Sequence, residues 1–457
     1  MTPTSSMPTI RAWQINVVLL CIGAGMFVLS HQLVQEYDHF TIGFAGVAGW
    51  SIVLYLIAVW LVLTQPINRF TLPIILAVAV ACRVVPLEAP PHLSSDIYRY
   101  VWDGIVQHAH INPYRYIPAD AHLAFLRAPH QDIFDNINRR DYARTIYPPA
   151  AQILFYLTTW ISPTVLWMKT VMILLEGITL YGLVALLKEL GLRREQVLLY
   201  AWCPLLVWEV AGSGHIDSAV IAFVTLTLLA RYRRQPIATG IFLAIAILLK
   251  FYPLVLFPAL YRRGDWRMPA ACASVIAVGY SIYSSAGMLV FGFLGGYTKE
   301  EGMTTGARYF LYVLSQQIPG LRRLPITAFF IFSALVFLAI IVWAWRRNRS
   351  SDPKAAFLAP AFALAAALMF LFSPHYAWYI IWLIPFFTLM PNLAILTYLT
   401  GFFYLYTTAW ADPGPKMYFL NKTLYAGVFV AFLLQQTLSR WPVHHHFFKL
   451  KRTAEYP

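Results

Sequence analysis

Long apolar runs separated by short charged loops fill most of the chain. The runs at residues 15–34, 43–63, 72–85, 165–187 and 327–345 contain few charged side chains. A helix needs roughly 20 predominantly apolar residues to cross the hydrocarbon core of a membrane. The pattern therefore predicts an all-α fold, a polytopic transmembrane helical bundle.

Shorter apolar runs continue the pattern and decide the expected number of spans. The segment KFYP at 250–253 interrupts one run, and because proline breaks helices we expect a broken hairpin with arms 237–249 and 254–261. Residues 150–161 are too short to cross, so we predict a re-entrant or interfacial half-helix. The chain then crosses about 14 times, or about 12 times if the arms around Lys250 turn back within the membrane. The remaining expected spans are 197–211, 219–230, 269–285, 355–372, 378–389, 393–408 and 425–438.

Loop charge predicts which side of the membrane each loop occupies. Arg11 and the later basic loops belong in the cytoplasm by the positive-inside rule. Residues 1–457 then form a single membrane domain. We expect an outer loop at 88–162, with interfacial helices and the half-helix, and a second outer loop at 286–324.

Composition supports the membrane class and excludes others. Hydrophobic residues make up 59% of the chain and charged residues only 12%, whereas soluble domains carry about 25% charged residues. The net charge of +14 is explained by the inner loops, so no nucleic acid partner is expected. The four cysteines lie in apolar runs without metal-ligand spacing, and we interpret them as packing residues.

The segment 94–150 is the long polar part of an otherwise apolar chain, and it carries two acids of interest. Asp96 follows the third span, and Asp103 comes about two helical turns later. If residues 97–108 form a helix, both carboxylates lie near one face, which is the candidate active site. The alternative for either acid is a solvated charge paired with Arg99.

The expected topology brings ionisable side chains to the outer ends of several helices, although they are far apart in sequence. Such a one-sided gathering predicts a site between the helices. Each residue also has a structural alternative: a helix cap for Asp217 or Ser218, a snorkelling side chain for Lys250, a loop charge for Arg308, and an aromatic belt for His375. The gathered residues are Asp96, Asp103, His215, Asp217, Lys250, Arg308 and His375.

These residue types suit sugar transfer from a lipid phosphate. The chain contains neither GxxxxGK[ST] nor GxGxxG, so nucleotide binding of either type is not indicated. An acceptor hydroxyl needs a carboxylate base, for which Asp96 is the candidate. The departing phosphate needs cationic groups, for which Lys250, Arg308 and His375 are the candidates.

The sequence also resembles a known family. SSDIYRYVWDGIVQHAHINPY and TIYPPAAQ resemble the first outer loop of C-type membrane glycosyltransferases, particularly bacterial polyprenyl-phosphate-mannose-dependent mannosyltransferases. The later segments GHID, KFYP and SPHYAWY resemble the same group, so the likeness covers about residues 94–385. It implies a C-type fold and inverting transfer from a polyprenyl-phosphate sugar, with Asp96 as the catalytic base.

Paired acids one residue apart are frequent in such enzymes, but here Asp96 is followed by Ile97 and Tyr98. We therefore expect no cofactor and no metal ion, and a divalent cation stays an open alternative. The candidate substrate-binding residues are Asp103, Tyr98, Arg99, Tyr147, His215, Asp217, Lys250, Tyr252, Arg308, His375 and Tyr376.

The sequence thus predicts a multi-pass glycosyltransferase of the cytoplasmic membrane whose active site faces the periplasm or cell exterior. It would move a hexose, mannose by the resemblance, from polyprenyl phosphate to a lipid or glycan acceptor. Two alternatives stay open. A polymerase or ligase would use a polyprenyl-pyrophosphate donor, and a secondary transporter would place charges near the midplane and often shows two related halves.

Overall fold

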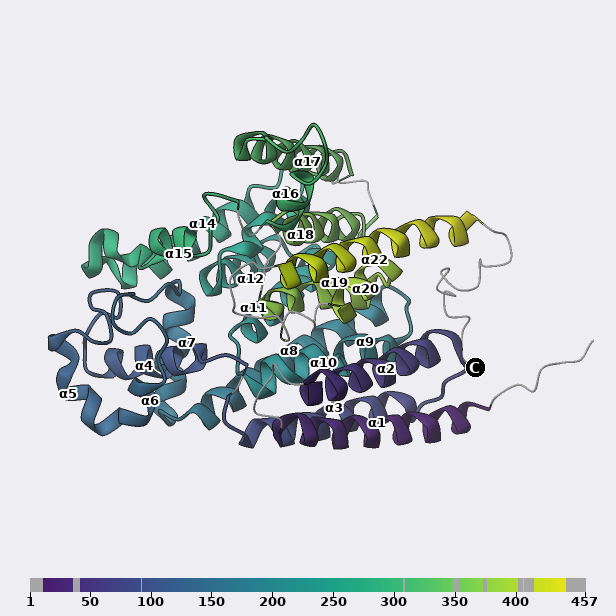
Figure 1. Ribbon diagram of the computed structural model, residues 1–457, viewed down its shortest axis with the longest axis horizontal. Coiled ribbons are helices and arrows are strands. Elements are labelled where there is room, and N and C mark those ends of the chain that lie inside the picture. Colours follow the sequence, from purple (N-terminus) through teal and green to yellow (C-terminus); the bar gives the residue numbers. More distant parts are fainter. Residues whose placement is uncertain are drawn as a thin grey trace, which may run out of the picture.

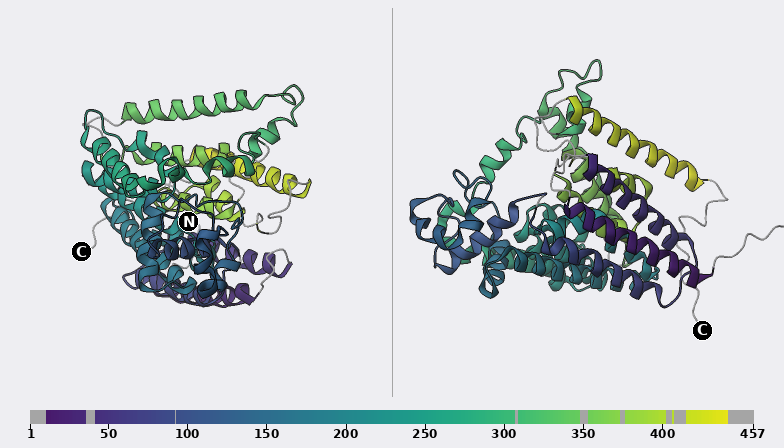
Figure 2. Two further views of the ribbon diagram at one scale, coloured as in Figure 1. Left: turned by 90° about the vertical axis from the view of Figure 1, so that its left-hand side faces the viewer. Right: turned by 60° about the horizontal axis from the view of Figure 1, so that its bottom comes forward.

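The structure is a computed structural model, and it describes residues 11–35, 42–91, 93–306, 309–347, 353–372, 376–401, 406 and 415–440. Every regular element in these ranges is helical, which confirms the all-α prediction. Long helices lie roughly alongside one another in one half of the molecule, and a group of shorter helices forms the opposite end (Figure 1). Figure 2 shows the same division from two further directions.

Five helices within the described ranges are long and apolar enough to cross a membrane. They are α1 (Ala12–Gln35), α2 (Ile42–Thr64), α3 (Thr71–Glu88), α8 (Val165–Glu189) and α17 (Ile326–Arg347). Large apolar side chains cover their outer faces, as expected for contact with lipid; Trp50 on α2 is 65% exposed and Ile331 on α17 is 62% exposed. The chain is therefore a multi-pass membrane protein.

A sixth span results if the bent pair formed by Arg267–Ile282 and Ser284–Glu300 is counted as one. The predicted 12 to 14 crossings exceed this number and stay a prediction. They would require shorter helices to cross as well. The shorter helices with apolar sequences are α12 (Pro236–Leu249), α18 (Leu358–Phe372), and η7 with α19 (Ala377–Leu383 and Ile384–Leu389). The described chain closes with α20 (Leu393–Gly401) and α22 (Pro415–Arg440).

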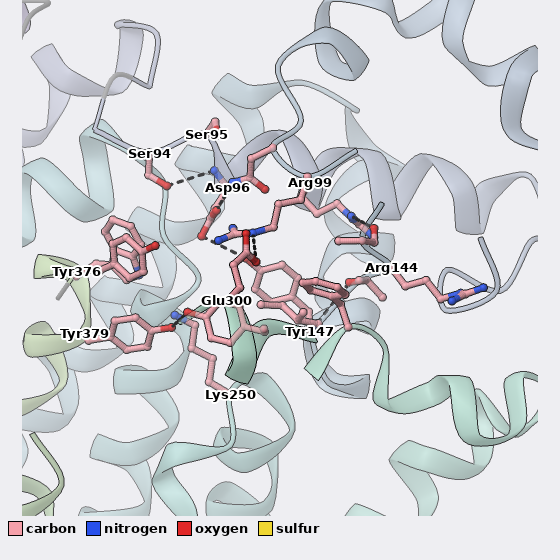
Figure 3. A pocket seen from close by; sticks show the side chains of 18 of the residues that line it. Ser94, Ser95, Asp96, Arg99, Arg144, Tyr147, Lys250, Glu300, Tyr376 and Tyr379 are labelled. Carbon is pink, nitrogen blue, oxygen red and sulfur yellow. Dashed lines mark hydrogen bonds and ion pairs between the residues drawn. The ribbon is translucent and has the colours of Figure 1, made fainter. Parts of the chain in front are cut away.

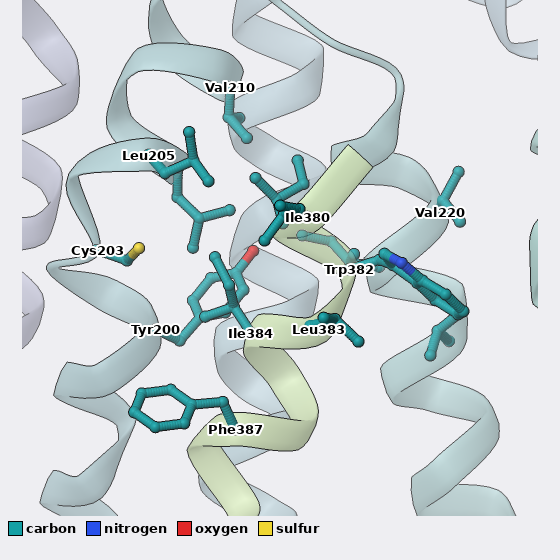
Figure 4. Packing of buried hydrophobic residues seen from close by; sticks show 14 of the residues in the cluster. Tyr200, Cys203, Leu205, Val210, Val220, Ile380, Trp382, Leu383, Ile384 and Phe387 are labelled. Carbon is teal, nitrogen blue, oxygen red and sulfur yellow. The ribbon is translucent and has the colours of Figure 1, made fainter. Parts of the chain in front are cut away.

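The expected span at residues 197–211 is not one continuous helix. The structure divides this segment into four short helical pieces, because Pro204 has no N–H to donate and Cys203 before it adopts an extended conformation. The pieces pack against η7 and α19, nearly 200 residues later in the chain (Figure 4). They are η3 (Arg194–Val197), α9 (Leu198–Ala201), α10 (Pro204–Leu206) and the π-helix η4 (Val207–Gly212).

The predicted break around residues 250–253 is confirmed. Helix α12 ends at Leu249, and Lys250 adopts an extended conformation. The chain resumes as η5 (Tyr252–Leu256) and α13 (Phe257–Leu260). Helix α12 packs against α11 (Asp217–Tyr232) and α14 (Arg267–Ile282), so the break lies at the end of a well-packed helix.

The predicted outer loop 88–162 is a compact group of helices. Its centre is α4 (Asp96–His108), which packs closely on α7 (Pro149–Ile161). Gly104 permits this approach, since a Cβ there would lie 2.2 Å from the Thr159 hydroxyl. Helix α7 covers the residues of the expected half-helix, and its far end is strongly exposed. Its re-entrant or interfacial position stays a prediction. The smaller elements are η1 (Ala121–Leu123), α5 (Ala124–Arg127), η2 (Ala128–His130) and α6 (Gln131–Asp135).

The predicted second outer loop folds back toward this group. After α14 the chain bends by 109° into η6 (Ser284–Phe291) and α15 (Leu294–Glu300), and α16 (Phe310–Ser315) follows. Two glycines with positive φ, Gly287 and Gly292, permit the change of direction. Gly292 lies against Thr145, and a Cβ at position 292 would be 1.7 Å from the Thr145 carbonyl oxygen. Helix α15 is thereby held beside the α4–α7 group (Figure 1).

Two buried cations join the spanning helices. Arg83 on α3 forms a bidentate ion pair with Glu176 on α8, with N–O distances of 2.6 and 2.5 Å. Lys169 on α8 donates to the carbonyls of Pro86 at 2.9 Å and Ala89 at 2.5 Å, at the C-terminal end of α3. This second contact fixes the start of the segment that leads to Asp96.

Candidate active site

A cavity of about 550 Å³ lies where the α4–α7 group, the end of α12, α15 and the segment after residue 375 meet. Figure 3 shows its side chains, which come from parts of the chain more than 280 residues apart. The lining is mostly tyrosine, arginine and small polar residues, with two carboxylates. The lining residues used below are Asp96, Arg99, Asn138, Arg139, Tyr142, Arg144, Tyr147, Lys250, Phe293, Tyr297, Glu300, Tyr376, Trp378 and Tyr379.

Asp96 begins α4, and its half-buried carboxylate reaches the cavity. A negative charge is stabilised at a helix N-terminus by the unpaired N–H groups and the helix dipole. The Asn138 amide donates to Oδ1 at 2.8 Å, and the Tyr147 hydroxyl donates to Oδ2 at 3.3 Å. Among the described residues no cation forms an ion pair with Asp96, so its carboxylate is oriented by neutral donors.

Tyr147 is suited to remain one of these donors. Burial, and after it the charge of Asp96, raises the pKa of Tyr147 well above its ordinary value. The ring stands edge-on to Tyr100 and Phe155, with centroids 5.0 and 5.5 Å away. The aromatic packing fixes the ring, and the hydroxyl therefore points at Asp96 in a defined direction.

Lys250 lies on another wall of the cavity (Figure 3). Its ammonium group forms an ion pair with Asp217, which is fully buried and also accepts a hydrogen bond from the Tyr252 hydroxyl at 2.9 Å. The same ammonium lies 4.9 Å from the centroid of the Tyr379 ring, within cation–π range. Asp217 thus neither caps α11 nor touches the cavity, and it holds Lys250 instead of leaving it to snorkel.

Asp103 lies outside the cavity lining. Its carboxylate accepts hydrogen bonds from Arg99 at 2.7 Å and from Gln152 at 2.9 Å, and its side chain is almost fully buried. Seven residues do bring it near the face of Asp96, but two turns also displace it by roughly 10 Å along α4. Arg99 does line the cavity, and its second contact is the Ala143 carbonyl at 3.1 Å.

His215 is buried behind the cavity. Its ring stacks on Trp378 with centroids 4.4 Å apart, and its Nε2 lies 3.2 Å from the carboxylate of Glu209. Glu209, in the π-helix η4, also accepts a hydrogen bond from Tyr406. His215 therefore supports a lining residue and does not line the cavity itself.

The remaining predicted site residues divide into three groups. Tyr376 lines the cavity, and its hydroxyl donates to Glu301 at 3.0 Å. Tyr98 on α4 and Tyr252 lie outside the lining. Arg308 and His375 lie outside the described residues.

Sequence reasoning missed the side chains contributed by residues 138–144 and by α15. Arg139 and Glu300 form an ion pair at 2.9 Å, and the Tyr142 hydroxyl donates to Glu300 at the same distance. Although burial opposes it, the Glu300 carboxylate raises the pKa of Arg139, which therefore stays charged. The acidic pair within the KEE triplet at 299–301, in a predicted outer loop, was the available signal. Nothing in the sequence indicated that this segment folds back toward Asp96.

The site combines the Asp96 carboxylate, cations at two walls and many aromatic rings. Such a set can accept a proton from a hydroxyl, bind an anionic leaving group and stack against a sugar. Among the described residues, no group of three or more His, Cys, Asp or Glu side chains could hold a metal ion.

Comparison with known proteins gives the family. A family model described as alpha-(1->6)-mannopyranosyltransferase, N-terminal domain (MptA/B family), matches residues 13–262, more than half of the 457-residue chain. That range includes Asp96, Asn138, Tyr147 and Lys250. No curated protein and no solved structure matches the chain. The chain belongs to the MptA/B family of alpha-(1->6)-mannopyranosyltransferases and is a mannosyltransferase, hence a glycosyltransferase enzyme.

Proposed function

We propose that the protein transfers mannose from a polyprenyl-phosphate donor to a hydroxyl of a lipid or glycan acceptor, in an α-(1→6) linkage and with inversion at the anomeric carbon. The observation that carries the proposal is the position of Asp96, whose carboxylate faces a cavity lined by Lys250 and is held by Asn138 and Tyr147. Family membership supplies the sugar and the linkage.

In the proposed reaction, the acceptor O–H bond breaks and Asp96 takes the proton. The acceptor oxygen forms a bond to the anomeric carbon as the bond from that carbon to the phosphate oxygen breaks. The electron pair of the broken bond stays on the lipid phosphate, whose charge Lys250 stabilises. Attack opposite the leaving group is a single displacement, which inverts the configuration.

We further propose that the site faces the outside of the cytoplasmic membrane and that the shorter apolar helices also cross, giving the 12 to 14 spans. The support is the charge distribution of the loops: the positive-inside rule assigns the basic segments 188–196 and 261–267 to the cytoplasm, and alternation of the predicted spans then assigns the site to the other side.

The donor is tested with purified protein in lipid nanodiscs and radiolabelled donors. The donors are polyprenyl-phosphate mannose, polyprenyl-phosphate glucose, a polyprenyl-pyrophosphate-linked mannose and a nucleotide-linked mannose. We expect label transfer from polyprenyl-phosphate mannose at least tenfold faster than from the others. Preferred transfer from the pyrophosphate would instead support a polymerase or ligase, and transfer from the nucleotide sugar without a lipid carrier would overturn the donor assignment.

A further inference from the structure

Three side chains of the cavity have no part in the reaction described above. They are Arg139, Tyr142 and Glu300, named here the outer trio. Glu300 accepts from Arg139 Nε at 2.9 Å on one oxygen and from the Tyr142 hydroxyl at 2.9 Å on the other. The Arg139 and Glu300 side chains are 26% and 35% exposed, so both keep hydrogen-bonding capacity for a ligand.

Two members of the outer trio, Arg139 and Tyr142, lie on the same loop as Asn138, which orients Asp96. Asn138 donates to Asp96, and the next residue, Arg139, has a φ of +54°. A left-handed conformation is unusual for arginine, so the surrounding structure must hold it. One loop therefore carries, at adjacent positions, Asn138, which donates to the Asp96 carboxylate, and Arg139 of the outer trio. Figure 3 shows Glu300 extending into the space beside Asp96.

The two cations Arg139 and Lys250 differ in where their carboxylate partners lie. Arg139 forms an ion pair at 2.9 Å with Glu300, a carboxylate that itself lines the cavity and would repel a phosphate. The carboxylate that pairs with Lys250, Asp217, is fully buried and outside the lining. An anionic phosphate is therefore better placed at Lys250, and the outer trio is a poor phosphate site.

The same groups fit a neutral sugar. A sugar hydroxyl is both a donor and an acceptor, and the outer trio offers guanidinium and phenol donors next to a carboxylate acceptor. The rings of Phe293 and Tyr297 on the same wall supply apolar faces, and Arg139 lies 5.8 Å from the centre of the Tyr297 ring. The cavity is large enough for such a ligand, since small-ligand sites begin at roughly 300 Å³ and the cavity measures about 550 Å³.

We propose that Arg139, Tyr142 and Glu300 form the acceptor subsite, and that it takes the terminal sugar of a neutral glycan whose reacting hydroxyl then reaches Asp96. The inference deepens the proposed function and rests on it for the identity of the reaction. It assigns the donor phosphate to Lys250 and the acceptor sugar to the outer trio, and both line the cavity that Asp96 faces.

The test compares Glu300→Gln and Tyr142→Phe with wild type and with Arg140→Gln. Arg140 is the matched control because it neighbours Arg139 but pairs with Asp135 at 3.0 Å outside the cavity. Transfer is measured from polyprenyl-phosphate mannose to an alkyl α-mannoside, varying each substrate in turn. For Glu300→Gln we expect the KM for the mannoside to rise roughly 10- to 100-fold, as for loss of a charged hydrogen bond. The donor KM stays within twofold, and Arg140→Gln resembles wild type.

A second measurement does not depend on the donor. Methyl α-mannoside should raise the Tm of wild type and of Arg140→Gln but not of Glu300→Gln. A rise in donor KM with an unchanged mannoside KM would overturn the acceptor assignment and leave the proposed function intact. Equal mannoside-dependent Tm shifts in all three proteins would overturn it as well. Absence of transfer from polyprenyl-phosphate mannose, with the Tm pattern as expected, would overturn the donor assignment alone.

Discussion

Removing the charge of Lys250 separates its structural contribution from its proposed contribution to transfer. Asp217 is fully buried, and the Lys250 side chain is only 14% exposed. Lys250→Met therefore leaves a buried carboxylate whose remaining partner in the structure is the neutral hydroxyl of Tyr252. Breaking a buried ion pair on one side costs about 3 to 5 kcal/mol, because the other charge stays desolvated.

The double variant Lys250→Met/Asp217→Asn removes both charges. Since replacing both partners of a buried pair is often close to neutral, most of the stability lost in Lys250→Met should return. Transfer should not return, because no cation is left on that wall for the lipid phosphate. We expect the transfer rate of both variants to fall by a factor of roughly 100 to 1000, typical for loss of one group that stabilises charge in the transition state.

The assay uses thermal unfolding in detergent together with initial rates from polyprenyl-phosphate mannose. Asp217→Asn alone is the control that keeps Lys250 and removes its partner. The reasoning is refuted if the double variant regains both stability and transfer, because Lys250 would then be a purely structural cation. It is equally refuted if Lys250→Met unfolds at the wild-type temperature, because the ion pair would then contribute nothing.

Two further predictions concern the framework around the site. Gly292→Ala should lower transfer at least tenfold, since φ is +55° and a Cβ would meet the Thr145 carbonyl at 1.7 Å, displacing the α15 wall. Gly295→Ala, with open space around its Cβ, should keep wild-type activity, and loss in both would contradict the argument. Arg83→Met should destabilise the protein by about 3 to 5 kcal/mol in a detergent melt, with partial recovery in Arg83→Met/Glu176→Leu. An unchanged melt would show that the pair contributes nothing.

Local sequence signals predicted several elements correctly. The helix assumed over residues 97–108, on which the placement of Asp96 and Asp103 near one face depended, is observed at Asp96–His108. Proline at position 253 predicted the break after α12 at which Lys250 lies, and two prolines before Ala150 predicted the start of α7. Such predictions depend on neighbours in sequence, which a single chain supplies.

Tertiary contacts were beyond the same reasoning. The pairing of Glu300 with Arg139 joins residues 161 positions apart, and the sequence does not encode in any local pattern that a 109° bend returns α15 to the α4–α7 group. For Asp103, the position on the helix was predicted, but the side chains that cover it were not. Helical spacing correctly placed it near the face of Asp96, but only the structure shows that Arg99 and Gln152 cover it. In a strongly apolar chain, spans also cannot be counted reliably from run lengths.

The catalytic role of Asp96 is tested most directly by the initial transfer rate of Asp96→Asn. Asparagine keeps the size of the side chain and can still accept from Asn138 or Tyr147, but it cannot take a proton from the acceptor. Loss of a general base predicts a fall of roughly 100- to 10,000-fold at saturating donor and acceptor, with the donor KM and the melting temperature close to wild type. A rate within threefold of wild type would contradict the account, because the acceptor hydroxyl would then lose its proton to another group.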